Sequence, residues 1–385
     1  MTWKLMEDKF TFREREKLCD FIKNTDRFTN GPLVKEFEQN WSDWLGVSNS
    51  VMINSGASGN YLSVAILKHL RGVGEVIVPS LGWSTDVSSL IQMGLTPVFV
   101  DINPSNLCID ADALENAISS KTVAVVLIHT LGFNGLSENI IDICHKNNLF
   151  LIEDCCEAHG ATYDNKRVGS VGDLSVFSFY YGHHITTIEG GMVCSNNSKY
   201  YDFAKMFRSH GMIREASNEV QEYYIHEFKD LNPLFTFAVP GFNFRSTEIN
   251  AFIGLQQMLN IDAIVKKRTS NLIHWLNALN NNKYFTHFNV KGSSNFALPL
   301  LLNEESPALF SRVKKCLLEN KVEFRVGTAG GGNLARQPFV INNNHRISGN
   351  LKNTEKVHNY GLYVGNHENL KFDQINALVE VLNGL

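Results

Sequence analysis

Short apolar runs alternate with amphipathic segments along the first 210 residues of the chain. Apolar runs bounded by small or polar residues favour buried strands, and a 3.6-residue apolar period favours helices. Strands and helices that alternate in this way predict right-handed crossovers and a parallel sheet with helices on both faces. The pattern predicts strands at 51–54, 75–79, 96–101, 123–128, 150–152 and 174–177, and helices at 12–25, 32–41, 61–70, 84–93, 111–118, 137–146 and 199–208.

The last part of the chain has a different pattern. The segment 212–234 is polar, rich in aromatic residues and without a clear period, which predicts a long loop. We expect a large α/β domain at 1–280, ending in a long helix at 247–280, and a smaller α+β domain at 281–385 that begins at a polar run. The smaller domain is predicted to contain strands 296–302 and 323–326 and helices 307–318 and 373–382.

Composition describes an ordinary globular chain. It has 385 residues, of which 44% are hydrophobic and 19% charged, and a net charge of -4. These values exclude a disordered or fibrous protein, and the length exceeds one typical core. No basic run favours a nucleic-acid partner. No apolar stretch has the length of a signal peptide or a membrane span, so we expect a cytoplasmic protein that does not bind membranes.

The seven cysteines predict neither disulfides nor a metal site. Their number is odd, most lie in apolar segments, and no pair has the C-x-x-C spacing. Cysteines of this kind in a cytosolic protein are usually buried free thiols. We therefore expect no metal.

The stretch 151–193 carries most of the candidate chemistry. Asp154 follows one predicted strand and Ser178 follows another, and ligands of α/β sheets bind at the carboxyl ends of strands. From Ser178 the chain leaves through a turn that contains Gly182, His183 and His184. We expect these groups to meet at one site.

Two other segments have the composition of a ligand site. The small residues Gly56, Ala57 and Ser58 open a predicted helix, whose free N–H groups and dipole suit a phosphate. An ordinary helix cap is the alternative. Trp83 lies where the strand 75–79 ends, and is either a core residue or a ring that stacks on a ligand.

Two motifs resemble those of a known family. Residues 153–160 read E-D-C-C-E-A-H-G and residues 177–183 read F-S-F-Y-Y-G-H. They are similar to the E-D-x-A-x-x-x-G and F-S-F-x-x-x-K motifs of the DegT/DnrJ/EryC1/StrS sugar aminotransferases, and the resemblance covers nearly the whole chain. It implies an α/β fold of the PLP-dependent aspartate aminotransferase type (fold type I) and pyridoxal 5'-phosphate as the cofactor.

The resemblance implies roles for individual residues. Asp154 would pair with the pyridine nitrogen, Trp83 would stack on the ring, and the phosphate would be held by Ser178 and by the segment 56–58, which contains Gly56, Ala57 and Ser58. Asn243, in the segment G-F-N-F-R, would reach the phosphate bound to the neighbouring subunit. A homodimer with shared active sites is therefore implied.

One position departs from the aminotransferase motif. His183 stands where the family has the lysine that binds the cofactor covalently, and histidine there is characteristic of the sugar 3-dehydratase branch. Glu157, in place of the usual Gln, resembles the same branch. The resemblance implies noncovalent pyridoxamine 5'-phosphate, formed with L-glutamate, and His183 as the base that takes a proton from its C4' carbon. The C3 hydroxyl of a nucleotide-linked 4-keto-6-deoxy sugar, GDP-4-keto-6-deoxy-D-mannose, would then leave.

A glycine-rich loop at 327–338 contains the pattern G-N-x-x-x-Q-P, formed by Gly332, Asn333 and Gln337. Such a loop is either a connector or a binding loop on a rigid scaffold. A similar pattern in the 3-dehydratase branch implies that these three residues and Arg325 bind the substrate.

Several alternatives remain open. His184 is a rival for the base role or a structural hydrogen-bonding residue. A plain aminotransferase is disfavoured because no lysine lies between Phe177 and Val193. An iron–sulfur 3-dehydratase needs about four cluster ligands, and only two cysteines follow Cys156. Two further alternatives are a dehydratase that acts on a heptose or another nucleotide-linked 4-keto sugar, and a cofactor-binding protein without catalytic activity.

Overall fold

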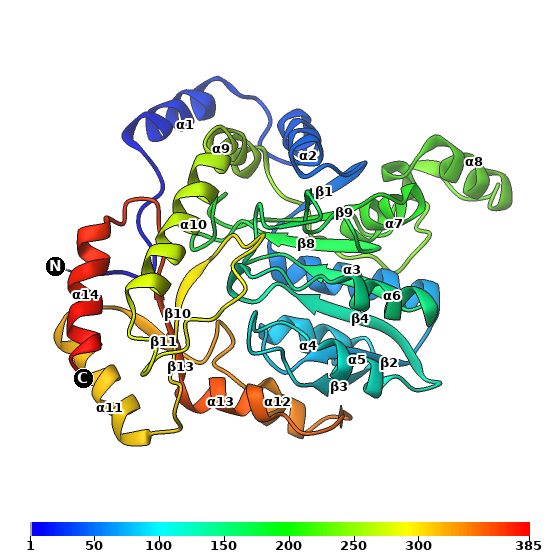
Figure 1. Cartoon of the computed structure of the whole chain (residues 1–385). Helices are drawn as coiled ribbons and strands as arrows, with labels where there is room; N and C mark the ends of the chain where they lie inside the picture. Colours follow the sequence, from blue (N-terminus) through cyan, green and yellow to red (C-terminus); the bar gives the residue numbers. More distant parts are fainter. Residues whose placement is uncertain (1) are drawn as a thin grey trace.

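The structure is a computed structural model that describes residues 2–385, and it is built around one mixed eight-stranded sheet (Figure 1). The strand order is β1-β9-β8-β5-β4-β2-β3-β12. Strands β2, β3, β4, β5 and β8 run parallel, as predicted, and β12 adds to β3 in parallel. The strands are β1 (Asn49–Ile53), β2 (Glu75–Pro79), β3 (Thr96–Val100), β4 (Thr122–Ile128), β5 (Phe150–Asp154), β8 (Leu174–Ser178), β9 (Gly191–Ser195) and β12 (Arg346–Ile347).

The sheet is not wholly parallel. Strand β9 runs antiparallel to β8, and β1 pairs antiparallel with β9. The chain returns from β8 to β9 through residues 179–190, which form no helix. A return without a crossover helix is typical of antiparallel neighbours. This return segment carries His183.

Helices cover both faces of the sheet. Buried side chains of α2, α5, α6 and α9 pack on one face, and those of α3, α4, α7 and α12 pack on the other. Every residue of β5 and β8 is buried, which explains why both read as apolar runs. The helices of this layer are α2 (Pro32–Leu45), α3 (Gly56–Arg71), α4 (Ser84–Gln92), α5 (Ala111–Ala117), α6 (Glu138–Lys146), α7 (Ser198–Arg208), α9 (Glu248–Met258) and α12 (Pro338–Ile341); α1 (Phe12–Asn24) precedes them.

A second core lies between an antiparallel sheet of order β10-β13-β11 and the helices α10, α11 and α14. Trp3 packs into this core, and its Nε1 donates to the Gly365 carbonyl at 3.0 Å. The N-terminal segment is thereby attached to the C-terminal part of the fold. The elements are β10 (Ala297–Leu301), β11 (Phe324–Val326), β13 (Gly361–Gly365), α10 (Ile261–Ala278), α11 (Pro307–Glu319), α13 (Lys352–Tyr360) and α14 (Phe372–Asn383).

The predicted division between residues 280 and 281 stays a prediction. Packing crosses it in both directions, because α10 lies before it and packs on α14 in the second core. Strand β12 lies after it and extends the large sheet.

The single long helix predicted at 247–280 is wrong. Helix α9 ends and α10 begins on either side of Leu259 and Asn260, and Asn260 has φ -121° and ψ 6°, outside the helical region. Helix α9 packs on α2, whereas α10 packs on α14. The break lets the two helices pack in different cores. An interruption of two residues is too short to change the periodic pattern of apolar residues from which a helix is predicted.

The long loop predicted at 212–234 is wrong, because this segment contains a helix and two short turns. It contains α8 (Asn218–Glu227) between the 3-10 turns η2 (Ile213–Glu215) and η3 (Pro233–Phe235). Helix α8 has no buried residue, so its sequence lacks the apolar stripe from which a helix is predicted. Figure 1 shows α8 at the edge of the molecule, away from the helices α11 and α14.

The remaining elements are short. Strands β6 (Thr162–Tyr163) and β7 (Lys166–Arg167) form a hairpin, and η1 (Thr130–Gly132) and η4 (Leu334–Arg336) are single turns. Within residues 2–385, no helix combines the length and the apolar character needed to span a bilayer.

Candidate active site

A cavity of about 370 Å³ lies between the carboxyl ends of the large sheet and the second core. Strands β4, β5 and β8 contribute Ile128, Asp154 and Ser178 from one side, and β11 and β13 contribute Arg325 and Tyr363 from the other. The site is therefore at the predicted edge of the sheet. The predicted site residues that line it are Gly56, Ala57, Trp83, Asp154, Glu157, Ser178, His183 and Arg325; Ser58, Asn243, Gly332, Asn333 and Gln337 do not line it.

The N-terminus of α3 forms one end of the cavity. The Ser55 side chain caps the helix by accepting from the Ser58 N–H at 3.0 Å, which explains why Ser58 points into the cap and not into the cavity. The N–H groups of Gly56 and Ala57 have no acceptor within the helix. A Cβ on Gly56 would lie 2.6 Å from the Ser178 Cβ, so only glycine lets α3 approach Ser178 this closely.

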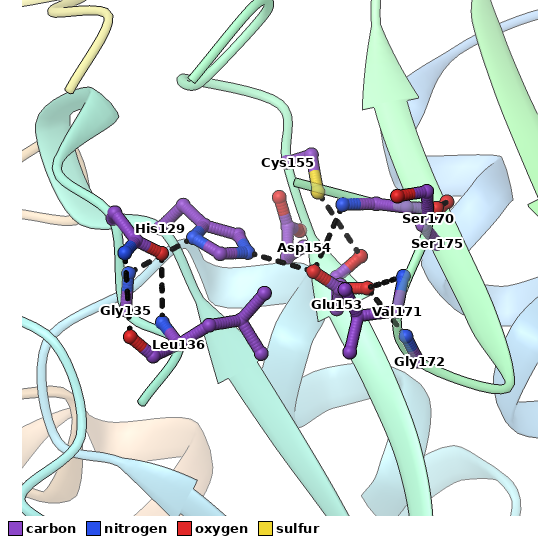
Figure 2. Close-up of polar contacts among 12 residues, drawn as sticks. His129, Gly135, Leu136, Glu153, Asp154, Cys155, Ser170, Val171, Gly172 and Ser175 are labelled. Atoms are coloured by element: carbon purple, nitrogen blue, oxygen red, sulfur yellow. Dashed lines mark hydrogen bonds and ion pairs between the residues drawn. The ribbon is translucent and has the colours of Figure 1, made fainter. Parts of the chain in front are cut away.

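The consecutive acidic residues Glu153 and Asp154 serve different purposes, because side chains alternate along a strand. Asp154 lines the cavity, whereas Glu153 is enclosed beneath it. Figure 2 shows the Glu153 carboxylate between His129 on one side and Val171 and Gly172 on the other.

The Glu153 carboxylate accepts hydrogen bonds from three backbone N–H groups of the 169–172 loop and from one histidine. Its oxygens accept from the N–H groups of Gly169 at 2.8 Å, Val171 at 3.0 Å and Gly172 at 2.6 Å (Figure 2). His129 accepts at Nδ1 from the Gly135 N–H, so its Nε2 donates to Glu153 at 3.2 Å. Burial, the largest influence, raises the pKa of Glu153, but these donors lower it overall. Glu153 is a fixed anion that anchors the 169–172 loop.

The donor atoms of His129, Glu153 and Cys155 lie within 4.8 Å of one another, a separation that suits a metal ion. However, the Glu153 oxygens are already occupied by four N–H donors. This group is explained by the loop that it holds, and it gives no support to a metal.

Three carboxyl groups form the acidic end of the cavity: Asp154, Glu157 and Asp86. Glu157 accepts from the Leu131 N–H at 2.6 Å, yet burial and the neighbouring Asp154 raise its pKa to about 7. Asp86 was missed by the sequence analysis. It is the third residue of α4 and accepts at 2.8 Å from the Trp83 N–H, an arrangement that an acidic residue three positions after a helix N-cap can indicate.

His183 also lines the cavity. Its ring is 5.3 Å from that of Phe296 and 6.0 Å from that of His159, and its Nδ1 has no hydrogen-bond partner among the described residues. Burial first, and then the charges of Lys9 and Arg268, lower the pKa of His183 to about 3. The imidazole is therefore neutral at pH 7.

His184 differs from His183 in its surroundings. It is wholly buried and does not line the cavity. Ser294 Oγ donates to the His159 carbonyl at 2.6 Å and so accepts from His184 Nε2 at 3.0 Å. The Lys9 ammonium donates to the His184 carbonyl at 3.0 Å. These contacts give His184 a structural role and leave His183 as the imidazole of the cavity.

The glycine-rich loop reaches the cavity through other residues than those predicted. Thr328 and Ala329 line it, whereas Asn333 is buried and donates from Nδ2 to Glu355 at 2.6 Å. Gly332 has φ +99°, and a Cβ there would meet the His358 ring at 2.4 Å. Gln337 precedes α12 as its N-cap. In this structure these three residues shape the loop itself.

Asn243 is exposed and lies outside the cavity of its own chain. Its Oδ1 accepts from Arg245 Nε at 3.1 Å. The predicted phosphate contact to a neighbouring subunit stays a prediction.

The N-terminal segment supplies lining residues that the sequence analysis missed. Leu5 and Met6 line the cavity, and a Cβ on Gly182 would lie 2.8 Å from the Met6 Sδ. Lys9, a few residues later, is almost fully buried, and its ammonium group donates to the His184 carbonyl. The burial of this lysine has no sequence signal, because it depends on distant parts of the chain.

The sequence model of the DegT/DnrJ/EryC1/StrS aminotransferase family matches residues 11–383. The GDP-4-keto-6-deoxy-D-mannose 3-dehydratase of Yersinia pseudotuberculosis is 32% identical over 372 residues, which cover 94% of this chain and 93% of the relative. The enzyme of the same name from Escherichia coli O55:H7 is 30% identical, covering 95% of this chain and 96% of the relative.

Solved structures agree with these sequence matches. The E. coli GDP-4-keto-6-deoxy-D-mannose-3-dehydratase with bound hydrated PLP superimposes with a TM-score of 0.90 at 28% identity, covering 99% of both chains. A structure of GDP-4-keto-6-deoxymannose-3-dehydratase with a trapped PLP-glutamate geminal diamine also gives 0.90 at 28% identity, covering 99% of this chain and 100% of the other. The predicted fold class, that of PLP-dependent aminotransferases, is confirmed.

Proposed function

The chain belongs to the DegT/DnrJ/EryC1/StrS aminotransferase family, and within that family we propose that it is a PLP-dependent sugar 3-dehydratase. Its substrate is a nucleotide-linked 4-keto-6-deoxy sugar, GDP-4-keto-6-deoxy-D-mannose, from which it removes the C3 hydroxyl. The observation that carries the proposal is His183, a neutral imidazole in the cavity at the position of the family's lysine. The 3-dehydratases named above, similar along nearly the full length, support the same reaction.

The cavity suits the proposed cofactor at both of its ends. The start of α3, with Gly56 packed against Ser178, offers free N–H groups and a hydroxyl to a phosphate. Asp154 is buried and makes no ion pair with any of residues 2–385, so a ring nitrogen that carries a proton would find an unpaired carboxylate. Trp83, at the cavity edge, is half exposed and free to stack on a planar ring.

When bound as pyridoxamine 5'-phosphate, the cofactor supplies an amino group that condenses with a keto sugar and a ring that accepts electrons. His183 accepts the proton released at the C4' carbon of the cofactor, and the same imidazole can return a proton to the departing C3 hydroxyl. Asp154 stabilises positive charge at the ring nitrogen. Hydrolysis then releases ammonia and a 4-keto-3,6-dideoxy sugar, and L-glutamate restores the amino form.

The test is a dehydration assay with purified protein. We expect the protein to remove one water from GDP-4-keto-6-deoxy-D-mannose in air, with pyridoxal 5'-phosphate and L-glutamate as the only additions. Mass spectrometry measures the loss. A panel that includes other nucleotide-linked 4-keto sugars and a heptose identifies the preferred substrate. Transfer of an amino group to the sugar in place of dehydration would contradict the proposal.

The same assay separates this reaction from an iron–sulfur type. The two cysteines after Cys156 are Cys194, buried in β9, and Cys316, buried in α11 of the second core. They belong to different cores, and this arrangement favours a reaction without a cluster. A requirement for reduced nicotinamide and a reductase would favour the cluster mechanism.

The proposal includes a homodimer in which Asn243 acts on the partner's cofactor phosphate. Exposure of Asn243 and of α8, a helix without a buried residue, supports a partner on this side of the molecule. Exposed apolar side chains between residues 223 and 237 add to that argument: Tyr223, Ile225, Phe228, Leu231, Leu234, Phe235 and Phe237.

Subunit mixing tests the shared site. An Asn243→Ala subunit and a His183→Asn subunit, each inactive alone, should together regain activity in about a quarter of their sites at random pairing. Exchange is verified by mass spectrometry of tagged subunits. Exchange without regained activity would show that Asn243 serves its own chain. The expected cytoplasmic location, and the expected absence of nucleic-acid and membrane partners, stay predictions.

A further inference from the structure

The Asn60 side-chain amide donates a hydrogen bond to each of two carboxyl groups, those of Asp86 and Asp154. The Asn60 side-chain nitrogen lies 2.9 Å from Asp86 Oδ1 and 3.1 Å from Asp154 Oδ2. The two carboxyl oxygens are therefore at most about 6.0 Å apart, the sum of these distances. Both side chains are nearly inaccessible to solvent, with relative exposures of 2% and 5%. Two carboxylates this close and this well shielded from solvent repel strongly when both are charged.

The other groups around Asp86 do not offset that repulsion. Its Oδ2 accepts from the Trp83 N–H and Asp154 Oδ1 accepts from the Cys156 N–H, and both donors are neutral amides. Glu157 adds a third carboxyl group nearby. Among residues 2–385, no lysine, arginine or histidine forms an ion pair with Asp86 or Asp154. A buried pair of acids without a cation is neutralised by a proton.

We propose that Asp86 is a positioning residue that keeps a proton at neutral pH and donates it in a hydrogen bond to Asp154. The pair then carries one negative charge, located on Asp154 at the carboxyl end of β5. Asn60 and the protonated Asp86 fix the orientation of that carboxylate. The consequence for the cofactor, that its ring nitrogen meets a single oriented charge, rests on the proposed function.

Burial and the nearby Asp154 raise the pKa of Asp86 well above its ordinary value, in agreement with the geometry. A carboxyl group whose pKa is higher in the folded than in the unfolded protein makes stability fall as pH rises between those two values. Below the unfolded value, both states are protonated and nothing is lost. The proton on Asp86 is therefore visible in the pH dependence of unfolding, without any cofactor or substrate.

The first experiment compares thermal unfolding of the cofactor-free protein with that of Asp86→Asn between pH 5 and pH 8. The amide is neutral and keeps the acceptor for Trp83 and a donor for Asp154. We expect the melting temperature of Asp86→Asn, relative to that of the natural protein, to rise between pH 5 and pH 8 by on the order of 2–5 °C. The control is Asp112→Asn, an exposed acid in the first turn of α5, for which the difference should not change with pH. A constant or reversed difference for Asp86→Asn would mean that Asp86 is ionised and would overturn the proposal.

The second experiment measures the dissociation constant of pyridoxal 5'-phosphate by absorbance and fluorescence. Asp86→Asn should stay within about threefold of the natural protein, whereas Asp86→Leu should bind about tenfold more weakly, because Asp154 loses a hydrogen bond to a charged group. Equal affinity in Asp86→Leu would overturn the positioning role. If no variant binds the cofactor, the proposed function fails, while the unfolding experiment still decides whether Asp86 keeps its proton.

Discussion

Two groups of residues at the cavity use the same physical effect with opposite sign. Asp86, Asp154 and Glu157 line the cavity and form no ion pair among residues 2–385, and burial beside another acid raises the pKa of Asp86 and of Glu157. Three imidazoles are subject to the charges of Lys9 and Arg268, and burial together with these charges lowers the pKa of each imidazole. Burial and a neighbouring like charge thus favour the neutral form in both groups of residues.

This difference decides which proton each group can handle. The buried acids Asp86 and Glu157 hold protons at a pH where an exposed carboxyl group has lost them, so they can donate hydrogen bonds. The imidazole of His183 stays unprotonated at a pH where an exposed imidazole is partly charged, so it can accept a proton. The cavity lining therefore combines proton-holding acids with a proton-accepting imidazole.

Removing the proton acceptor should have the strongest consequence. His183→Asn should lower kcat about 10²–10⁴-fold or more, because His183 is the one imidazole that lines the cavity among residues 2–385, while cofactor affinity should change little. Turnover of GDP-4-keto-6-deoxy-D-mannose and the dissociation constant of pyridoxal 5'-phosphate are the measurements.

The matched variant is His184→Asn, at the next position in the chain. Its loss should appear in thermal stability, because His184 donates to Ser294 in the core. If His184→Asn loses turnover at unchanged stability while His183→Asn keeps it, the base is His184.

A second, intermediate effect distinguishes two buried glutamates four positions apart. Glu157 has a pKa raised from 4.5 to about 7, so the natural protein loses stability as pH rises through that interval. Glu157→Gln should lack this loss and be more stable above pH 7, by at most ~3 kcal/mol for an interval of about 2.5 pH units. Denaturant unfolding at pH 5 and pH 8 measures the difference.

Glu153→Gln is the contrasting variant, with the opposite sign. The pKa of Glu153 is lowered overall, so its contribution to stability is present at neutral pH and is lost as pH falls. The variant should be destabilised at pH 8 and less so at low pH. If both glutamine variants changed stability at pH 8 in the same direction, the different roles assigned to Glu157 and Glu153 would be contradicted.

A weaker effect on the pH profile is expected from Lys9, one of the two cations that lower the pKa of His183. Lys9→Met removes a charge that lowers the pKa of His183, so the acidic limb of kcat/KM should move to higher pH, by roughly 0.5–1 pH unit. Lys9→Arg should retain the natural profile. Lys4→Met, an exposed lysine of the same segment, is the control. An unchanged limb in Lys9→Met would show that Lys9 is uncharged or that another group sets the limb.

Most of the fold follows from the sequence because buried strands and amphipathic helices have strong periods. The strands β2, β3, β4, β5 and β8 and the helices between them lie within a few residues of their predicted positions. Helix α8 was missed because it buries nothing in its own chain, and the break at Leu259 and Asn260 was missed because it is shorter than the period. Strand β13 was also missed, although it is the central strand of the smaller sheet.

Three features follow from the sequence alone: the family motifs, the parallel core of the large sheet, and the chemical types at the site, which are a carboxylate, a hydroxyl and an imidazole near the ends of neighbouring strands. These features are local, because a motif or a period is contained in a short segment. The sequence also placed His183 at the lysine position, from which the proposed reaction follows.

The packed fold determines which of two neighbouring polar residues faces the cavity. Glu153 and Asp154 are both acids and His183 and His184 are both histidines, but only Asp154 and His183 line the cavity, whereas Glu153 and His184 are fully buried outside it. The protonation of Asp86 and the burial of Lys9 likewise depend on residues far away in the chain, such as Asn60, Asp154 and Arg268. Desolvation and the distance between charges are properties of packed neighbours, so no local pattern encodes them.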